Sequence, residues 1–331
     1  MPVKLNHILF LLSIFSFLLS GCTSSSKQAE SDSAQQDSTM VAEKHPSLIL
    51  EGNTIRTRFA VPEDFERVAA APGSFEEFLQ NLALKPIASP IEQYNRQPTK
   101  DSLYWAMSIV DMDSIGFQNS HASIIRLRAE YLYRTKQFDK ISFIIKNNIP
   151  FDFKRWLQGY RVEAKGKSIN IKKLENETDM SYENFRAYLR DVFQYTDAKS
   201  FRKNLRLIKD DDDDNEFGIG TIIMSSRAPY DAVIVVDMIE MTANHSHPFG
   251  DTPAVLFAYG DPFAKEIAII SGYDWLGLFP KNRGEDWKED AGVIWSGGSK
   301  GDREIYKQGG NIDIWTNNFI KKNLLKFPKK S

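Results

Sequence analysis

One cysteine in the chain stands where its sulfur could be acylated. Cys22 is the only cysteine, and it ends the string Leu19-Ser20-Gly21-Cys22. Before it, Lys4 supplies a positive start, and Ile8 through Leu19 form an apolar run broken only by two serines. A membrane-spanning helix needs about 20 apolar residues, so this shorter run is typical of a secretory signal that is removed. We therefore predict a signal peptide over residues 1–21 and acylation of Cys22, with palmitate as one acyl group.

An acylated Cys22 would tie the protein to a membrane, so membrane lipid is its first predicted partner. One acyl chain binds a bilayer only marginally, whereas two or more anchor a protein stably. Thr23 stands where some lipoproteins carry the aspartate that retains them at the inner membrane. We therefore expect a lipid-anchored protein of the cell envelope, at the outer membrane. The alternative is a plain secretory signal with an incidental cysteine.

Two histidines have a spacing that could serve a metal ion. His245 and His247 are two residues apart, which in a strand would place both imidazoles on one side, with Asp251 close by. The surrounding composition is typical of a loop, and no third ligand is evident. The run from Asp210 to Asp214 lacks the glycine that a calcium loop needs at its sixth position. We expect no metal site and no cofactor.

Acidic residues lie at the ends of several expected strands. Asp111, Asp113 and Asp237 are the clearest cases, and paired carboxylates in a cleft can do acid–base work on a glycan. Asp111 and Asp113 are therefore candidate binding residues. Arg126 and Glu130 have i,i+4 spacing on an expected helix, which favours an internal ion pair instead.

The composition is that of a globular protein with a well-filled core. Hydrophobic residues make up 42% and aromatic residues 12% of the chain, and the formal net charge is −2. A nucleic-acid-binding protein would be expected to show a basic face, so we expect no nucleic-acid partner. With a single cysteine, disulfides within the chain cannot stabilise the fold.

The chain divides into three segments. After the signal peptide, residues 22–46 contain the modified cysteine and a tether rich in Ser, Gln, Asp and Ala, which cannot bury enough surface to fold. About 24 flexible residues span roughly 25 to 30 Å, which would hold the rest of the protein off the lipid surface. We predict a single globular α+β domain over residues 47–331.

Periodicity and turn residues predict helices first and an antiparallel sheet after them. In the first half we expect an edge strand over 55–61, a helix opened by a capping box at Ser74, a strand over 103–112, a helix over 118–134, a strand over 141–145, a helix over 181–195 and one capped by Asp197 through 207. In the second half we expect strands over 219–224, 232–238, 254–259 and 266–270, long loops over 271–310 and a helix over 312–327. This order predicts one α+β domain with helices packed on the sheet.

Several strings resemble an uncharacterised family of bacterial lipoproteins known only as a domain of unknown function. The strongest match is Arg126-Leu127-Arg128-Ala129-Glu130-Tyr131-Leu132-Tyr133. The others are Ser74-Phe75, Leu82-x-Leu84-Lys85-Pro86, Val110-Asp111-Met112-Asp113, Arg155-Trp156-x-x-Gly159, Ser181-Tyr182-x-x-Phe185-Arg186-x-Tyr188-Leu189 and Ala232-Val233-Ile234-Val235-Val236-Asp237. Together they run over residues 55–240, and more loosely to the C-terminus.

The resemblance also implies where a catalytic site would lie. In that family a Gln-Gln-Cys-Ala-Asp string precedes the Arg-Leu-Arg-Ala-Glu segment, and a Gly-His precedes the Ala-Val-Ile-Val-Val-Asp strand. A cysteine at a helix start and a histidine at a strand start are similar to papain-like cell-wall peptidases, which implies a papain-like arrangement. In this chain the cysteine position falls on Ser120 and the histidine position on Asp231. An Ala-Gln-Ser-Tyr string falls on Ala258-Tyr259-Gly260-Asp261, so Tyr259 is a further candidate binding residue.

Both substitutions weaken the chemistry. A serine hydroxyl is a poor nucleophile without a base poised near pH 7, and aspartate has an unperturbed pKa of about 3.9. His121 is a candidate binding residue, but adjacent helical positions lie about 100° apart, so it should not act as a base for Ser120. A simpler role for Ser120 is that of the N-cap, whose side chain accepts a backbone N–H.

Two functional hypotheses follow. The first is a lipid-anchored envelope protein whose papain-like domain is catalytically inactive and acts by binding or scaffolding. Its ligand would be a peptidoglycan fragment, a glycan or another envelope protein. The second is a divergent hydrolase of amide or ester bonds, with Ser120 as nucleophile and Asp231 as base or orienter. The sequence favours the first and leaves open whether the protein is an enzyme.

Overall fold

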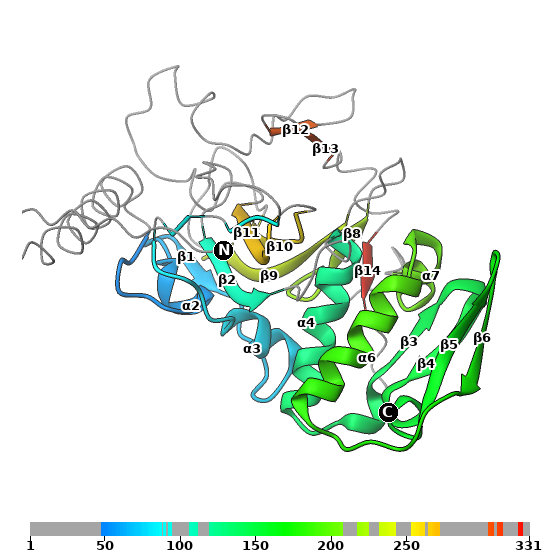
Figure 1. Ribbon diagram of the computed structural model, residues 1–331. Helices are drawn as coiled ribbons and strands as arrows, with labels where there is room; N and C mark the ends of the chain where they lie inside the picture. Colours follow the sequence, from blue (N-terminus) through cyan, green and yellow to red (C-terminus); the bar gives the residue numbers. More distant parts are fainter. Residues whose placement is uncertain are drawn as a thin grey trace, which may run out of the picture.

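The computed structural model describes residues 48–87, 89–90, 92–94, 106–111, 119–207, 217–224, 232–242, 253–261, 264–271, 304–307, 310–313 and 324–326 (Figure 1). The predicted signal peptide, Cys22, the tether, Asp113 and Asp231 lie outside these ranges. The described part contains both helices and strands, and its strands pair antiparallel, as predicted for an α+β fold.

The largest sheet has eight described strands. Their order is β2 (Ala106–Asp111), β11 (Glu266–Ser271), β10 (Ala254–Tyr259), β9 (Ala232–Met241), β8 (Ile222–Met224), β14 (Leu324–Lys326) and β7 (Arg206–Leu207), and β1 (Phe65–Arg67) also pairs with β9. β9 is the longest of them, and its residues 232–239 are all buried. A continuous apolar run of this kind indicates a strand covered on both faces.

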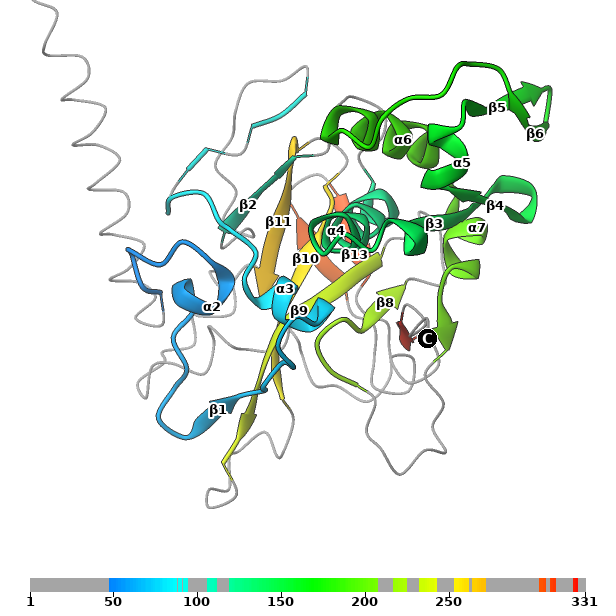
Figure 2. The same cartoon turned by 90° about the horizontal axis from the view of Figure 1, so that it is seen from below.

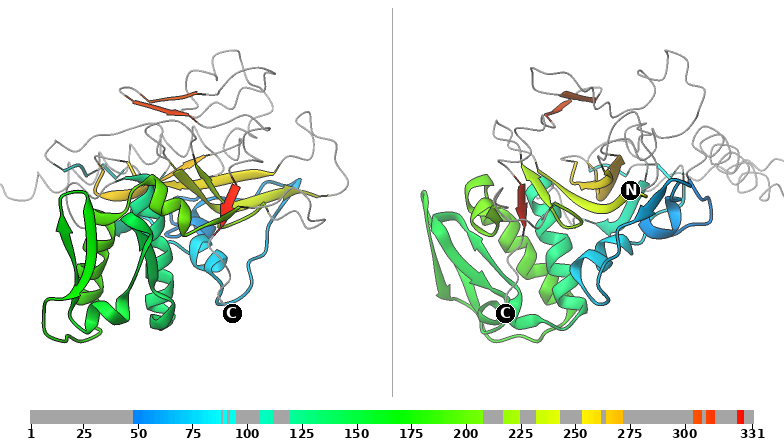
Figure 3. Two further views of the ribbon diagram at one scale, coloured as in Figure 1. Left: turned by 90° about the vertical axis from the view of Figure 1, so that its right-hand side faces the viewer. Right: turned by 180° about the vertical axis from the view of Figure 1, so that it is seen from behind.

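Two helices pack against one face of this sheet. α4 (Ser120–Arg134) contacts β9 and β10, and α3 (Phe75–Gln80) contacts β9. Figures 2 and 3 show α4 directed away from the sheet, with α6 (Tyr182–Tyr195) beside it. The first turn of α4 therefore lies against the sheet, and its last turn lies at the far side of the helical layer.

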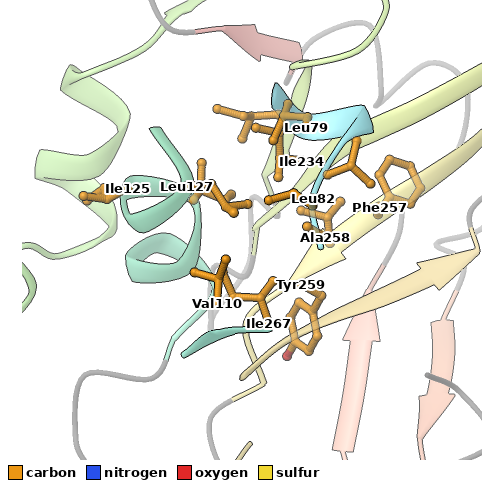
Figure 4. Close-up of a cluster of buried hydrophobic side chains, with 14 of the residues drawn as sticks. Leu79, Leu82, Val110, Ile125, Leu127, Ile234, Phe257, Ala258, Tyr259 and Ile267 are labelled. Atoms are coloured by element: carbon orange, nitrogen blue, oxygen red, sulfur yellow. The ribbon is translucent and has the colours of Figure 1, made fainter. Parts of the chain in front are cut away.

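The core between the sheet and its helices is built from aliphatic and aromatic side chains. Figure 4 shows Leu79 and Leu127 from the helical side meeting Ile234 and Phe257 from the strands. All four side chains are buried. Fully burying a side chain of this kind contributes about 1.5–3 kcal/mol, so this layer stabilises the placement of α4 on β9.

A second group of elements lies beside α4 and α6. It contains the 3-10 helices η1 (Phe138–Lys140) and η2 (Lys146–Asn148), the hairpin of β3 (Ser142–Ile145) and β4 (Ile149–Asp152), α5 (Phe153–Leu157), the hairpin of β5 (Tyr160–Lys165) and β6 (Ser168–Lys173), and α7 (Ala198–Lys203). The hydroxyl of Tyr188 on α6 donates a hydrogen bond of 2.7 Å to the backbone oxygen of Phe151 on β4. The two hairpins stand between helices, so the predicted order of helices first and sheet afterwards is too simple.

Polar residues cap the helices where the sequence predicts it. Ser74 accepts a hydrogen bond from the Glu77 N–H (3.1 Å), and Asp197 accepts one from the Ser200 N–H (2.8 Å). Both bonds satisfy amide groups that a helix start leaves unpaired. The helix capped by Asp197 ends at Lys203 rather than at 207, because Arg206–Leu207 form β7 and pair with β14.

The prediction of an edge strand over 55–61 is wrong. Ile55–Arg58 form the short helix α2, whose N-cap is Thr54. The Thr54 hydroxyl accepts a hydrogen bond from the Thr57 N–H (3.3 Å), and the Thr57 hydroxyl accepts one from the Thr54 N–H (3.0 Å). This reciprocal capping outweighs the alternation of the side chains. It also turns Arg58 inward, where Nε donates to the Gly52 backbone oxygen at 2.6 Å.

Two predictions near the C-terminus are also wrong. Glu304–Lys307 (β12) and Gly310–Asp313 (β13) form an antiparallel hairpin, although loops were predicted over 271–310. Leu324–Lys326 form β14, within the predicted helix over 312–327, and pair with both β8 and β7. Strand pairing over a long sequence separation outweighs local helix propensity here.

Candidate functional site

Ser120 is the first residue of α4, not its N-cap. The N-cap is Asn119, which has an extended backbone and whose side-chain oxygen accepts the Ala122 N–H at 2.7 Å. Asparagine is among the strongest N-cap residues, so it takes this role ahead of the serine that follows. The prediction that Ser120 caps the helix is therefore wrong, and its hydroxyl is available for a contact outside α4.

The Ser120 hydroxyl is bound to the start of β9. Its oxygen accepts a hydrogen bond from the Ala232 backbone N–H at 2.9 Å, and Ser120 is only 1% exposed. Ala232 directly follows Asp231, which lies outside the described residues. The structure thus brings the start of α4 against the start of β9.

The segment after β10 closes the same region. A Cβ atom added at Gly260 would lie 2.6 Å from both Cβ and Oγ of Ser123 and 2.8 Å from the Asn119 backbone oxygen. Ser123 itself is buried, and its hydroxyl donates to the Ser120 backbone oxygen at 2.8 Å. The chain therefore passes so close to the first turn of α4 that position 260 has no room for a side chain.

Tyr259 is a core residue. It is the last residue of β10, it is buried, and it pairs with Ala268 of β11. Figure 4 shows its ring beside Val110 and Ile267. Asp261, two residues on, is also buried and accepts the Ala264 N–H at 3.1 Å, which fixes the turn into β11. Tyr259 therefore has a role in packing the sheet, and Asp261 in holding Ala264 just before β11.

His121 packs against α7. The residue is 8% exposed, and its ring lies 4.8 Å from the ring of Phe201, centroid to centroid, at an angle of 41°. Ser120 contacts β9, so the two neighbouring side chains meet different elements. This agrees with the angle of about 100° between adjacent helical positions.

Two of the acidic residues predicted at strand ends, Asp111 and Asp237, lie on different strands of the large sheet, and Asp113 lies outside the described residues. Asp111 ends β2 and pairs with Glu266 at the start of β11, whereas Asp237 lies inside β9 and pairs with Leu256 of β10. Two strands separate β2 from β9, which puts their axes roughly 14 Å apart. Asp111 and Asp237 therefore lie on strands that are not neighbours, which does not favour a close carboxylate pair.

Asp237 instead holds three elements together. Its Oδ1 accepts hydrogen bonds from Gln80 Nε2 on α3 (2.8 Å) and from the Met238 N–H (3.0 Å), and its Oδ2 lies 3.0 Å from Arg67 Nε on β1. The side chain is fully buried. Burial raises the pKa of Asp237 to about 6, while Arg67 and Gln80 act in the opposite direction. Nothing in the sequence pattern links these three residues, because they come from distant segments.

The predicted ion pair on α4 is confirmed. Arg126 Nη1 binds Glu130 Oε1, and both side chains are buried. The Tyr182 hydroxyl on α6 donates to the same carboxylate oxygen at 2.5 Å and accepts a hydrogen bond from Arg126 Nη2 at 3.0 Å. Arg134 Nε lies 3.3 Å from Glu130 Oε2. This network joins the last turns of α4 to the start of α6.

Within the described ranges, no group of three or more His, Cys, Asp or Glu residues is placed to hold a metal ion. His245, His247, Asp251 and the run from Asp210 to Asp214 lie outside those ranges. A search of the same described ranges finds no helix with the length and apolar character needed to span a bilayer.

Comparison with known proteins identifies the family and leaves the activity open. No curated protein and no solved structure matches the chain. Residues 55–257, which are more than half of the sequence, match a family described as "Domain of unknown function (4846)". This segment contains α4, β9 and the first four residues of β10, and it ends before Tyr259 and Gly260. The chain therefore belongs to the family described as "Domain of unknown function (4846)".

Proposed function

We propose that this protein is a lipid-anchored component of a bacterial cell envelope, with a catalytically inactive papain-like domain that acts by binding or scaffolding. The observation that carries the proposal is the buried Ser120 hydroxyl bonded to the Ala232 N–H. A nucleophile must reach its substrate and needs a base to take its proton. Ser120 is covered, and its oxygen already accepts a hydrogen bond from the protein.

The papain-like part of the proposal is supported by the pairing of two segments. The start of α4 and the start of β9 are more than a hundred residues apart in sequence, yet one hydrogen bond of 2.9 Å joins them. A cysteine at position 120 would stand at a helix N-terminus, where the helix dipole lowers a thiol pKa. A histidine at position 231 would be one residue from the backbone group that Ser120 now binds.

A second candidate function is based on the position of Ser120, whose bonding partner Ala232 directly follows Asp231 in the sequence. If Ser120 rotated away from Ala232, it would still lie next to the segment that carries Asp231. A divergent hydrolase of amide or ester bonds would then use Ser120 as nucleophile and Asp231 as base or orienter. This candidate requires the closed region to open, because the described structure leaves only 1% of Ser120 exposed.

Labelling with a fluorophosphonate separates the two candidates. The full-length protein in detergent is treated with the probe and, in parallel, with purified peptidoglycan. We expect neither labelling nor release of fragments. Ser120→Ala is the test variant and Ser123→Ala is the matched control, because both serines are buried in the first turns of α4. Labelling or turnover that Ser120→Ala removes and Ser123→Ala keeps would establish the hydrolase.

The papain-like arrangement can be tested without a probe or substrate having to reach position 120. The double variant Ser120→Cys, Asp231→His should form a thiolate–imidazolium pair, which absorbs near 240 nm at pH values where an ordinary thiol, with a pKa of about 8.5, is protonated. Ser120→Cys alone is the control, measured in a Cys22→Ser background so that position 120 holds the only thiol. If both variants titrate alike, the two positions do not face each other and the papain-like arrangement is wrong.

The lipid anchor is tested by metabolic labelling. Cells that express the chain are grown with a radioactive palmitate, and the membranes are separated on a density gradient. We expect label on the wild-type chain in the outer-membrane fraction and none on the Cys22→Ser variant. An unlabelled wild-type chain would show that the segment ending at Cys22 is a plain secretory signal.

A further inference from the structure

The last turn of α4 borders an open pocket of about 360 Å³. Its lining comes from the end of α4, the turn after it, η1 and the first residue of α6: Glu130, Tyr133, Arg134, Lys136, Phe138 and Tyr182. At a rise of 1.5 Å per residue, the two ends of α4 are roughly 20 Å apart. The pocket is therefore distinct from the closed region around Ser120.

The aromatic rings of the pocket are held in place by the fold. The ring of Tyr133 lies 5.5 Å from Tyr182 and 5.4 Å from Phe138, in edge-to-face contacts, and stacks on Phe185 at 4.3 Å. The Tyr133 hydroxyl donates to the Met180 backbone oxygen at 2.8 Å. Tyr182 is nonetheless 45% exposed. A ligand would meet rings that need no rearrangement, which reduces the entropic cost of binding.

The charges around the pocket are mostly positive. Glu130 is buried at its base, and its carboxylate is occupied by Arg126, Arg134 and the Tyr182 hydroxyl. Lys136 lies in the turn after α4 with a φ of 57°, it is exposed, and no ion pair joins it to another described residue. The lining therefore holds two cations, Arg134 and Lys136, against one acid whose carboxylate already has partners, so a ligand that carries an anionic group is favoured.

We propose that this pocket binds an acidic saccharide, a sugar ring that carries a carboxylate. The apolar face of the ring packs on the exposed aromatic surface, the ring hydroxyls bond to polar groups at the rim, and the carboxylate meets Arg134 and Lys136. The pocket is at the small end of the roughly 300–1,000 Å³ range of ligand sites. It is also open to solvent, which suits one unit of a longer chain. The proposal rests on the envelope-binding function and names its ligand class.

Calorimetry on the full-length protein in detergent tests the ligand class. The probes are a disaccharide of N-acetylglucosamine and N-acetylmuramic acid, a disaccharide that contains glucuronic acid, and the neutral chitobiose. We expect an acidic disaccharide to bind about tenfold more tightly than chitobiose, a factor that corresponds to about 1.4 kcal/mol. The two acidic probes distinguish a muramic-acid source from a uronic-acid source. Equal affinity for all three, or no binding of any by a folded protein, overturns the proposal.

Charge variants then test the position of the site. Lys136→Asn removes the charge and keeps a residue that tolerates a positive φ, so the fold should be unaffected. We expect it to abolish most of the preference for the acidic disaccharide and to leave chitobiose binding unchanged. Lys167→Asn is the matched control, because Lys167 is exposed in the turn between β5 and β6. An unchanged preference in Lys136→Asn overturns the assignment of this pocket.

Sedimentation with purified peptidoglycan separates failure of this site from failure of the proposed function. Wild-type protein and Lys136→Asn are each mixed with intact sacculi and spun down. If both sediment equally, the envelope-binding function stands and this pocket is not its site. If neither protein sediments and the fluorophosphonate labels Ser120, the proposed function itself is wrong. Weaker sedimentation of Lys136→Asn alone supports both proposals.

Discussion

The two ends of α4 differ in how closely the rest of the chain packs around them. At the N-terminal end, Ser120 and Ser123 are buried, and Gly260 passes too close to Ser123 to carry a side chain. At the C-terminal end, the side chains border an open pocket of about 360 Å³, and Tyr182 is 45% exposed. The string that resembles a catalytic motif is at the closed end. Residue types indicate which chemistry a position could support, but packing by distant segments decides whether a ligand can reach it.

The largest expected effect comes from the buried ion pair near the open end. Glu130→Gln leaves the Arg126 guanidinium buried opposite a neutral group, and breaking a buried pair in this way typically costs about 3–5 kcal/mol. We expect a loss of that size in the free energy of unfolding, measured by urea denaturation.

A double variant provides the control for Glu130→Gln. Arg126→Met with Glu130→Leu removes both charges and keeps the volume, so it should recover most of the lost stability. A Glu130→Gln protein as stable as the wild type would mean that solvent reaches the Arg126–Glu130 pair. Water in the pocket at the end of α4 would then contact the buried acid at its base.

The next prediction tests the close contact between Gly260 and the N-terminal end of α4. Gly260→Val would place a branched side chain within 3 Å of Ser123 and of the Asn119 backbone oxygen, and overpacking of this kind costs about 1–3 kcal/mol. Gly218→Ala is the matched control, because a Cβ atom there meets nothing within 4 Å. Urea denaturation should show a loss for the first variant and none for the second. Equal stability would mean that the start of α4 can shift to make room.

A loss of comparable size is expected when the hydroxyl that joins α4 to β9 is removed. Ser120→Ala leaves the buried Ala232 N–H without its acceptor, which costs about 1–3 kcal/mol. Ser123→Ala removes a donor to a helical backbone oxygen and should cost less. Thermal denaturation of both variants measures the difference. If Ser120→Ala is as stable as the wild type, the hydrogen bond from Ala232 to the Ser120 hydroxyl does not hold β9 against α4. The hydroxyl could then serve another purpose, such as that of a nucleophile.

The helices could be predicted from local signals. Ser74 and Asp197 each cap a helix through its own third residue, and the Arg126–Glu130 pair lies within one helix turn. Such contacts depend only on nearby residues, so periodicity and capping rules identify them. The predicted N-cap of α4 was wrong by one residue, because Asn119 competes with Ser120 for the same role.

The strands and the site depend on contacts that no local pattern contains. β14 is a strand because it pairs antiparallel with both β8 and β7. α2 is a helix because Thr54 and Thr57 cap its start through reciprocal hydrogen bonds. The pocket joins the end of α4 to Tyr182, which is more than forty residues later in the chain. The sequence contains the residues of the pocket, but only the fold brings their rings together.

The smallest expected effect concerns Asp237, a buried acid on β9 that lies at neither end of α4. Asp237 has a folded-state pKa of about 6, above the value of about 3.9 expected in the unfolded chain. The folded protein therefore binds a proton more tightly, so the stabilisation is complete below pH 4 and is lost as the pH rises through 6. Between pH 7 and pH 5 the wild type should gain about 1 kcal/mol relative to Asp237→Asn, measured by urea denaturation at both values. Unlike Ser120, Asp237 is buried with charged and polar partners on three elements, so a difference that stays constant with pH would show that Arg67 keeps the carboxylate ionised. The Arg67–Asp237 ion pair would then stabilise the packing of β1 and α3 on β9, as the Arg126–Glu130 ion pair stabilises the C-terminal end of α4.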